Sequence, residues 1–133
     1  MKKALSSLLA VVILTILLTA CGNVAHVTRT KVDSDYFTQE EIDDAIDVIV
    51  DYFRREFDGC TLNEIHYIGD ERLYRLKQDP DSVDMIVLES TFTTGGYSDG
   101  SLTPNTTYDG YTWTLRRTDG GKWTHNIYEH GFG

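Results

Sequence analysis

Cysteine is scarce in this chain of 133 residues, which contains Cys21 and Cys60. Cys21 ends an N-terminal apolar run that we expect to be a processed signal, so Cys60 is the one cysteine of the remaining domain. No disulfide can then form within that domain, and its stability must come from side-chain packing. Cys60 follows Gly59 at a predicted helix-to-strand junction, where a small buried apolar residue is favoured over a reactive thiol.

Basic residues are also few, with 12 Lys and Arg against 21 Asp and Glu and a net charge of −9. From residue 21 onward ten basic residues remain against the same 21 acidic ones, and the net charge is near −11. Such a surface repels phosphate polymers and the anionic membrane leaflet. Nucleic-acid binding and polybasic docking to a membrane are therefore not expected.

A long apolar run of membrane-spanning length is missing. Residues 4–20 give seventeen mostly apolar positions with hydroxyl side chains among them, whereas a spanning helix needs about 20. Lys2 and Lys3 precede this run, and the small residues Thr19 and Ala20 end it, as in a cleaved signal peptide. An uncleaved N-terminal anchor and an ordinary secretory signal with a free thiol at Cys21 are the alternatives.

The segment Leu18-Thr19-Ala20-Cys21 resembles the lipobox of bacterial lipoproteins. That resemblance implies that Cys21 carries a diacylglycerol, becomes the first residue of the mature chain, and anchors it on the extracytoplasmic face of the cell membrane. Because a single acyl chain binds membranes only reversibly, a diacyl group is the minimum anchor. We therefore expect a signal peptide over residues 1–20, a flexible tether over 21–36, and one folded domain over 37–133.

A helix is predicted to begin after Thr38, because Thr38 and Glu41 form a capping box and Phe37 can pack on Ile42. Apolar residues then recur every three or four positions, and Gly59 is the expected stop. This apolar stripe consists of Ile42, Ala45, Ile46, Ile49, Val50, Phe53 and Phe57. The acidic opposite face of the helix is interpreted as solvent-exposed surface.

Four strands are predicted after the helix, over residues 61–68, 83–93, 111–118 and 123–128. A three-residue loop at 119–121, with Gly121 in the left-handed region, is expected to join the last two. It would pair Trp113 with Ile127 and would place Arg117 against the indole of Trp123. The expected fold class is α+β, with one long N-terminal amphipathic helix packed on a four-stranded antiparallel sheet.

This order of elements resembles the cystatin-like group, which includes the nuclear-transport-factor-like folds. It also resembles small lipoproteins of Gram-positive bacteria, in which a helix ending near a segment like Phe57-Asp58-Gly59-Cys60-Thr61-Leu62 precedes a sheet closed by a Gly-Lys-Trp hairpin, here residues 121–123. The resemblance implies a cystatin-like domain and carries no catalytic signature onto any residue.

Cystatin-like folds often enclose a pocket between helix and sheet, and His66, Tyr67 and His125 are the residues expected to line one here. Cys60, Glu64 and His66 are predicted to share one face of a strand, but about 20 Å of strand between Cys60 and His66 excludes direct proton transfer. The sequence lacks the His and Cys spacings of a metal site, and no cofactor is expected.

We therefore expect a lipid-anchored domain that binds a small ligand or an envelope protein without catalysis. The alternative is a small-molecule enzyme that uses His66 or His125 as a base in a pocket between helix and sheet. Inhibition of peptidases, as by true cystatins, lacks a recognisable inhibitory loop in the sequence.

Overall fold

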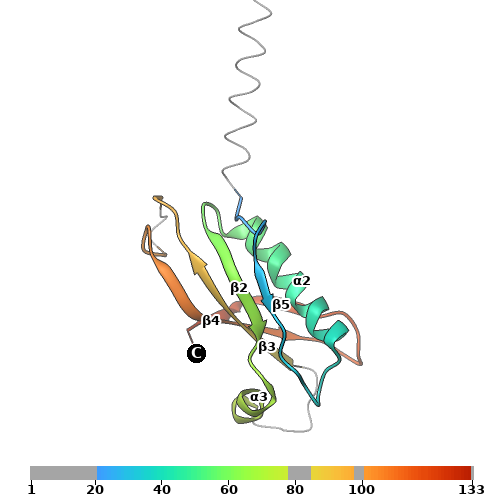
Figure 1. Ribbon diagram of the computed structural model, residues 1–133. Helices are drawn as coiled ribbons and strands as arrows, with labels where there is room; N and C mark the ends of the chain where they lie inside the picture. Colours follow the sequence, from blue (N-terminus) through green and yellow to red (C-terminus); the bar gives the residue numbers. More distant parts are fainter. Residues whose placement is uncertain (1–20, 78–84, 98–100, 133) are drawn as a thin grey trace, which may run out of the picture.

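The computed structural model describes residues 21–77, 85–97 and 101–132, and the signal peptide expected over 1–20 lies outside these ranges. Within these ranges two helices and five strands follow one another (Figure 1). In order they are β1 (Thr28–Thr30), α2 (Gln39–Glu56), β2 (Thr61–Tyr67), α3 (Asp70–Leu76), β3 (Met85–Thr93), β4 (Thr107–Arg116) and β5 (Thr124–Phe132).

The start of α2 confirms the predicted capping box. The Thr38 hydroxyl accepts from the Glu41 amide at 3.2 Å, and the Glu41 carboxylate accepts from the Thr38 amide at 2.8 Å. The predicted apolar stripe faces the core, where Ile42, Ala45, Ile46, Ile49 and Phe53 are all buried. Amphipathicity of this helix thus fixes which side packs on the sheet.

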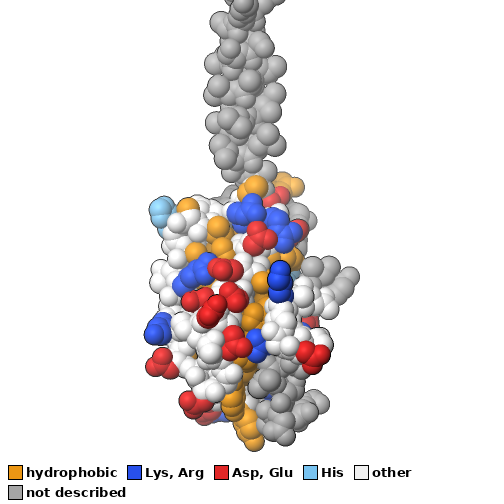
Figure 2. All heavy atoms as spheres, turned by 90° about the vertical axis from the view of Figure 1, so that its right-hand side faces the viewer, with side chains coloured by type: hydrophobic (Ala, Val, Ile, Leu, Met, Phe, Trp, Pro, Cys, Tyr) orange, Lys and Arg blue, Asp and Glu red, His pale blue; other side chains and the backbone are white. Residues whose placement is uncertain are grey.

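The outer face of α2 carries charges of both signs side by side (Figure 2). Asp47 pairs with Arg29 at 2.6 Å, and Asp51 pairs with Arg54 and Arg55 at 2.8 and 3.0 Å. These pairs are exposed and contribute little stability each. They agree with the interpretation of this face as solvent-exposed surface.

The expected cystatin-like arrangement of one N-terminal helix on a four-stranded antiparallel sheet is wrong. The sheet has five strands in the order β1-β2-β3-β4-β5, and β1 runs parallel to β2 while the other pairs are antiparallel. A strand therefore precedes α2, and a second helix, α3, follows β2. All three residues of β1 are exposed, so no apolar periodicity in the sequence marks this strand.

The segment expected to be a flexible tether, residues 21–36, is packed against the domain. The Gly22 amide donates to the Arg54 carbonyl at 2.9 Å, and the Asn23 amide donates to the Cys60 carbonyl at 2.8 Å. Gly22 is buried, and a Cβ on it would lie 2.4 Å from the Phe53 carbonyl oxygen. The prediction of a tether is corrected because close backbone approach and parallel pairing hold this segment in place.

The core lies between α2 and one face of the sheet and is filled by large side chains. A bulge between Leu62 and Glu64 in β2 changes which residues face this core. Cys60 and Leu62 are buried before the bulge, and Ile65 and Tyr67 are buried after it. The predicted common face for Cys60, Glu64 and His66 is therefore wrong.

The predicted register of the β4–β5 hairpin holds beside the loop, where Arg116 lies opposite Thr124, and fails beyond Leu115. Trp113 lies opposite His130 and Leu115 lies opposite His125, so residues 126–129 of β5 face the single residue Thr114. Positive φ angles occur at Asp119 and Gly120, not at Gly121. The sequence argument assumed a regular ladder, and this bulge of several residues breaks the two-residue alternation on which it rested.

Candidate binding groove

A groove of about 560 Å³ opens where α2 ends, beside the connection between β3 and β4. The residues that line it come from the last turn of α2 and the segment after it, from the β3–β4 connection, and from one position each in β4 and β5. They are Tyr52, Glu56, Phe57, Asp58, Cys60, Thr94, Tyr97, Ser101, Leu102, Tyr111 and His130. The volume is sufficient for a small organic ligand.

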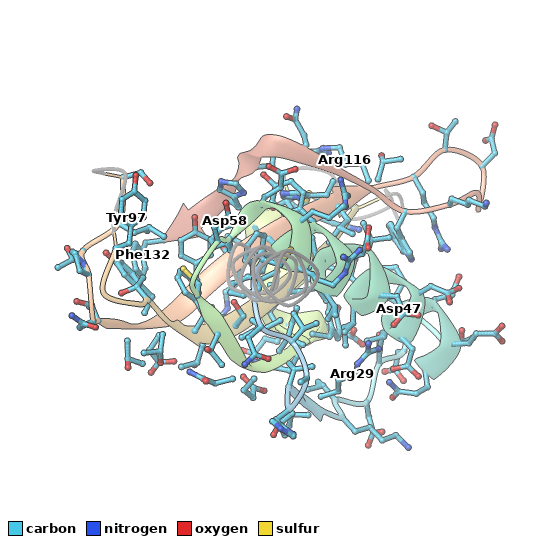
Figure 3. All side chains as sticks on the ribbon, turned by 90° about the horizontal axis from the view of Figure 1, so that it is seen from above. Arg29, Asp47, Asp58, Tyr97, Arg116 and Phe132 are labelled. Carbon is cyan, nitrogen blue, oxygen red and sulfur yellow. The ribbon has the colours of Figure 1, made fainter. Side chains whose placement is uncertain are left out.

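Aromatic rings form much of the groove wall. The Phe57 ring centroid lies 6.2 Å from that of Tyr52 and 6.3 Å from that of Tyr111, in edge-to-face arrangements. Tyr97 is 82% exposed, and Figure 3 shows it on the same side of the molecule as Asp58. The groove therefore offers ring surface from a buried wall and from an exposed rim.

A pair of half-buried histidines lies at the inner wall. His125 Nδ1 is 3.1 Å from the Thr114 carbonyl oxygen, and because a carbonyl only accepts, this nitrogen carries the proton. His125 Nε2 then accepts from His130 Nδ1 at 3.3 Å, which leaves His130 Nε2 as an acceptor. The contacts assign one neutral tautomer to each ring.

Burial keeps both histidines neutral near pH 7. Desolvation lowers the pKa of His125 below its usual value of 6.5. Desolvation also lowers the pKa of His130, and the charge that His125 would carry adds to this effect. Burial likewise raises the pKa of Tyr52 and Tyr111, so their hydroxyl groups stay protonated.

The charged side chains of the groove are both acidic. Glu56 and Asp58 line it, and no Lys or Arg is among its described lining residues. Arg55 lies 3.9 Å from Glu56 in an exposed pair, whereas the Asp58 carboxylate takes part in no ion pair within the described ranges. The groove therefore presents negative charge next to aromatic surface.

The three residues predicted to line a pocket do not come together. His66 faces away from the core beside Glu64, whose carboxylate lies 2.8 Å from His66 Nδ1. Tyr67 is fully buried and donates to Asp70 at 2.8 Å, which raises the pKa of the phenol together with burial. Only His125 lies near the groove, one residue behind its wall.

The pocket expected from the sequence did not include His130, Tyr52 or Tyr97, which line the groove. His125 and His130 are five positions apart, and a regular strand would place them about 16 Å apart on opposite faces. The bulge at 126–129 is what brings the two rings within 5.5 Å. Only the presence of two histidines near the predicted last strand was available as a signal in the sequence.

A second groove, of about 660 Å³, lies at the other end of α2. Its walls hold the β4–β5 hairpin onto the helix. The Arg117 guanidinium lies 4.3 Å from the Trp123 ring centroid, which confirms the predicted stacking, and 2.8 Å from the Glu41 carboxylate. The Trp123 indole N–H donates to the Glu41 carbonyl at 3.0 Å. These groups serve the fold.

Comparison of the chain with models of protein families, with curated proteins and with solved structures finds no match. Within residues 21–77, 85–97 and 101–132, no group of three or more His, Cys, Asp or Glu side chains is arranged to hold a metal ion. No helix in the same described part combines the length and apolarity needed to cross a membrane.

Proposed function

We propose that this protein is a membrane-anchored extracytoplasmic lipoprotein whose folded domain binds a small ligand in the aromatic groove at the end of α2. The observation that carries the binding proposal is the open groove of about 560 Å³ with aromatic walls. The lipobox-like segment that ends at Cys21 supports the anchor.

The position of Cys21 relative to the groove supports joining the two ideas. Cys21 is exposed, and the next residue, Gly22, is bonded to the Arg54 carbonyl in the last turn of α2. Glu56, which ends that turn, and Phe57 and Asp58, which follow it, line the groove. A lipid on Cys21 would therefore hold the groove close to the bilayer, with no spacer between anchor and domain.

The anchor is tested by mass spectrometry of the native protein and by labelling cells with a fatty-acid analogue. We expect a chain that begins at a diacylated Cys21 and takes up the label. Cys21→Ser should take up none, whereas Cys60→Ala, which changes the buried cysteine, should be labelled like the wild type. An intact Met1 or an unmodified Cys21 would contradict the proposed anchor.

Binding at the groove is tested by substituting Tyr97, the exposed residue at its rim. Tyr97→Ala removes ring surface from a side chain that is 82% exposed and should leave the fold intact. A library of small organic ligands is screened by NMR against the full chain in nonionic detergent micelles. Ligands that shift amide signals of residues 56–60 in the wild type should shift them less in Tyr97→Ala. A library without such a ligand contradicts binding at this groove.

Catalysis with a histidine base is the second candidate function. Neutral His130 lies at the groove wall with an acceptor nitrogen, so it has the protonation state that a general base requires. A panel of activated esters separates the two functions. Ester hydrolysis by the wild type that disappears in His130→Asn would support catalysis. Hydrolysis at the uncatalysed background rate with both the wild type and His130→Asn supports binding without catalysis.

A further inference from the structure

We infer that the ligand of the groove is an organic cation: an ammonium group, quaternary or protonated, that carries apolar substituents. This inference rests on the proposed binding function and adds the chemical class of the ligand. The argument has three parts: the rings, the charge, and the absence of an internal cation.

The rings supply surfaces that attract cations. A cation within about 6 Å of an aromatic ring centroid is stabilised by the negative face of the ring, and the gain is larger when water is excluded. Tyr52, Phe57 and Tyr111 lie 6.2 to 6.3 Å apart between successive centroids and are turned at 64° and 83° to one another. All three residues line the groove, and apolar substituents of an ammonium group gain contact with their rings.

Negative charge borders these rings. Glu56, the last residue of α2, and Asp58, just after the helix, both line the groove, and Asp58 lies on the same side of the molecule as Tyr97 (Figure 3). The Glu56 pair with Arg55 is long, at 3.9 Å, and half exposed on both sides, so solvent screens it. Both carboxylates are thus available to a ligand, and the net charge near −11 from residue 21 onward attracts cations over a longer range.

No side chain among the described lining residues supplies positive charge inside the groove. Its described lining contains neither Lys nor Arg, and the histidine at the wall is neutral because it is buried and accepts no second proton near pH 7. In the second groove, by contrast, Arg117 occupies the face of Trp123. A neutral sugar would also stack on the rings, but it would gain nothing from the two carboxylates as charges.

The experiment compares choline with 3,3-dimethylbutan-1-ol, a neutral molecule of the same shape. Both are titrated into the full chain in nonionic detergent micelles, and binding is measured from NMR shifts of amides 56–60. We expect choline to bind about tenfold more tightly than the alcohol, and to bind more weakly at high salt. Equal binding of the two, or binding of neither, would overturn the inference.

Variants test whether the groove carboxylates hold the cation. Asp58→Asn and Glu56→Gln should each weaken choline binding about threefold and leave binding of the alcohol unchanged. Asp33→Asn, which makes the same change in net charge at an exposed site outside the groove, should change neither. If Asp33→Asn weakens choline binding as much as Asp58→Asn does, the cation is not held by the groove carboxylates, and the inference fails.

The outcome for the ligand class is separate from that for the binding function. If the groove binds the alcohol as tightly as choline, and Tyr97→Ala loses both, the proposed binding function is supported and the inference of a cationic ligand fails. A second arm distinguishes a free ammonium compound from a lipid headgroup. With the chain anchored in nanodiscs, shifts of amides 56–60 that are present in phosphatidylcholine and absent in phosphatidylglycerol assign a headgroup. Shifts that appear in both lipids only when choline is added assign a free ligand.

Discussion

His125 Nε2 lies 3.3 Å from His130 Nδ1, and the bulge at residues 126–129 is what brings these two side chains together. Both rings also pack edge-on or tilted against Tyr52, at centroid distances of 4.9 and 6.0 Å. The pair thereby joins β5 to α2 through aromatic contacts rather than through charges. A second proton on His125 would occupy Nε2, the atom that accepts from His130 in the assigned hydrogen bond.

Protonation of this pair should destabilise the fold. The pKa of both histidines is lowered in the folded state, so the unfolded chain binds protons more readily as the pH falls below about 6.5. The free energy of unfolding should therefore be highest above pH 7 and should decrease as the pH falls from 7 to 5. Urea denaturation at pH 7.5 and 5.5 measures this difference.

The double variant His125→Asn, His130→Asn is the matched test of that cause, because it removes both titrating rings. We expect a smaller difference between the two pH values than in the wild type. His26→Asn, at an exposed position of the segment before β1, should keep the wild-type difference. A wild type that is equally stable at both pH values would contradict the prediction. The lowered pKa values of Glu41 and Asp70 act at lower pH and do not interfere.

The elements with a strong local pattern were predictable from the sequence. Thr38 and Glu41 defined the start of α2, and its apolar repeat defined the buried face. The strands from β2 to β5 were placed within a few residues of their bounds, because apolar runs and turn residues mark them. β1 was not predictable, since Thr28, Arg29 and Thr30 are exposed and owe their conformation to pairing with β2.

The groove was not predictable because its geometry depends on irregular backbone. Tyr97 and Asp58 lie outside any helix or strand, and no local pattern indicates that their segments meet. His130 joins them only through the bulge in β5, which the period-two rule cannot anticipate. Arg117 over Trp123 was predicted from the register next to the loop, and that register holds as far as Leu115.

Gly22→Ala should destabilise the fold by about 1–3 kcal/mol. A Cβ at this position would lie 2.4 Å from the Phe53 carbonyl oxygen, so the segment before β1 must move away from α2. Gly96→Ala is the control, because the atom nearest to a Cβ there would be the Asn105 side-chain oxygen, at 3.9 Å. Thermal and urea unfolding measure both. A Gly22→Ala variant as stable as Gly96→Ala would show that residues 21–36 are not held against the domain.

Ser90→Ala should cost about 1–3 kcal/mol, because it leaves the buried Trp113 indole N–H without its acceptor. The Ser90 hydroxyl accepts from Trp113 Nε1 at 2.8 Å, and both residues are fully buried. In a Trp113→Phe background the indole N–H is gone, and the same change should cost less. Equal costs of Ser90→Ala in the two backgrounds would contradict an interaction between them.

Arg117→Met and Glu41→Gln should be coupled by about 1 kcal/mol in a double-mutant cycle. The Arg117 side chain is 9% exposed and reaches the Glu41 carboxylate at 2.8 Å, so screening by solvent is reduced. Glutamine at position 41 can still accept from the Thr38 amide, which keeps the capping box intact. Additive effects of the two changes would show that the pair contributes nothing.

The pKa of Glu41 offers a second measure of the same contact. The Thr38 amide is the largest cause that lowers this pKa from 4.5, and the Arg117 guanidinium adds to it. In Arg117→Met the pKa of Glu41 should therefore rise only part of the way toward 4.5. Thr38→Pro would remove the amide donor and raise this pKa further. The folded-state pKa lies below the unfolded one, so the stability contributed by this carboxylate is greatest above pH 4.5. It is lost as the pH falls through the folded-state pKa. NMR titration of the Glu41 carboxylate in the wild type and in Arg117→Met checks the sign, and a pKa that is unchanged in Arg117→Met would contradict an effect of the guanidinium.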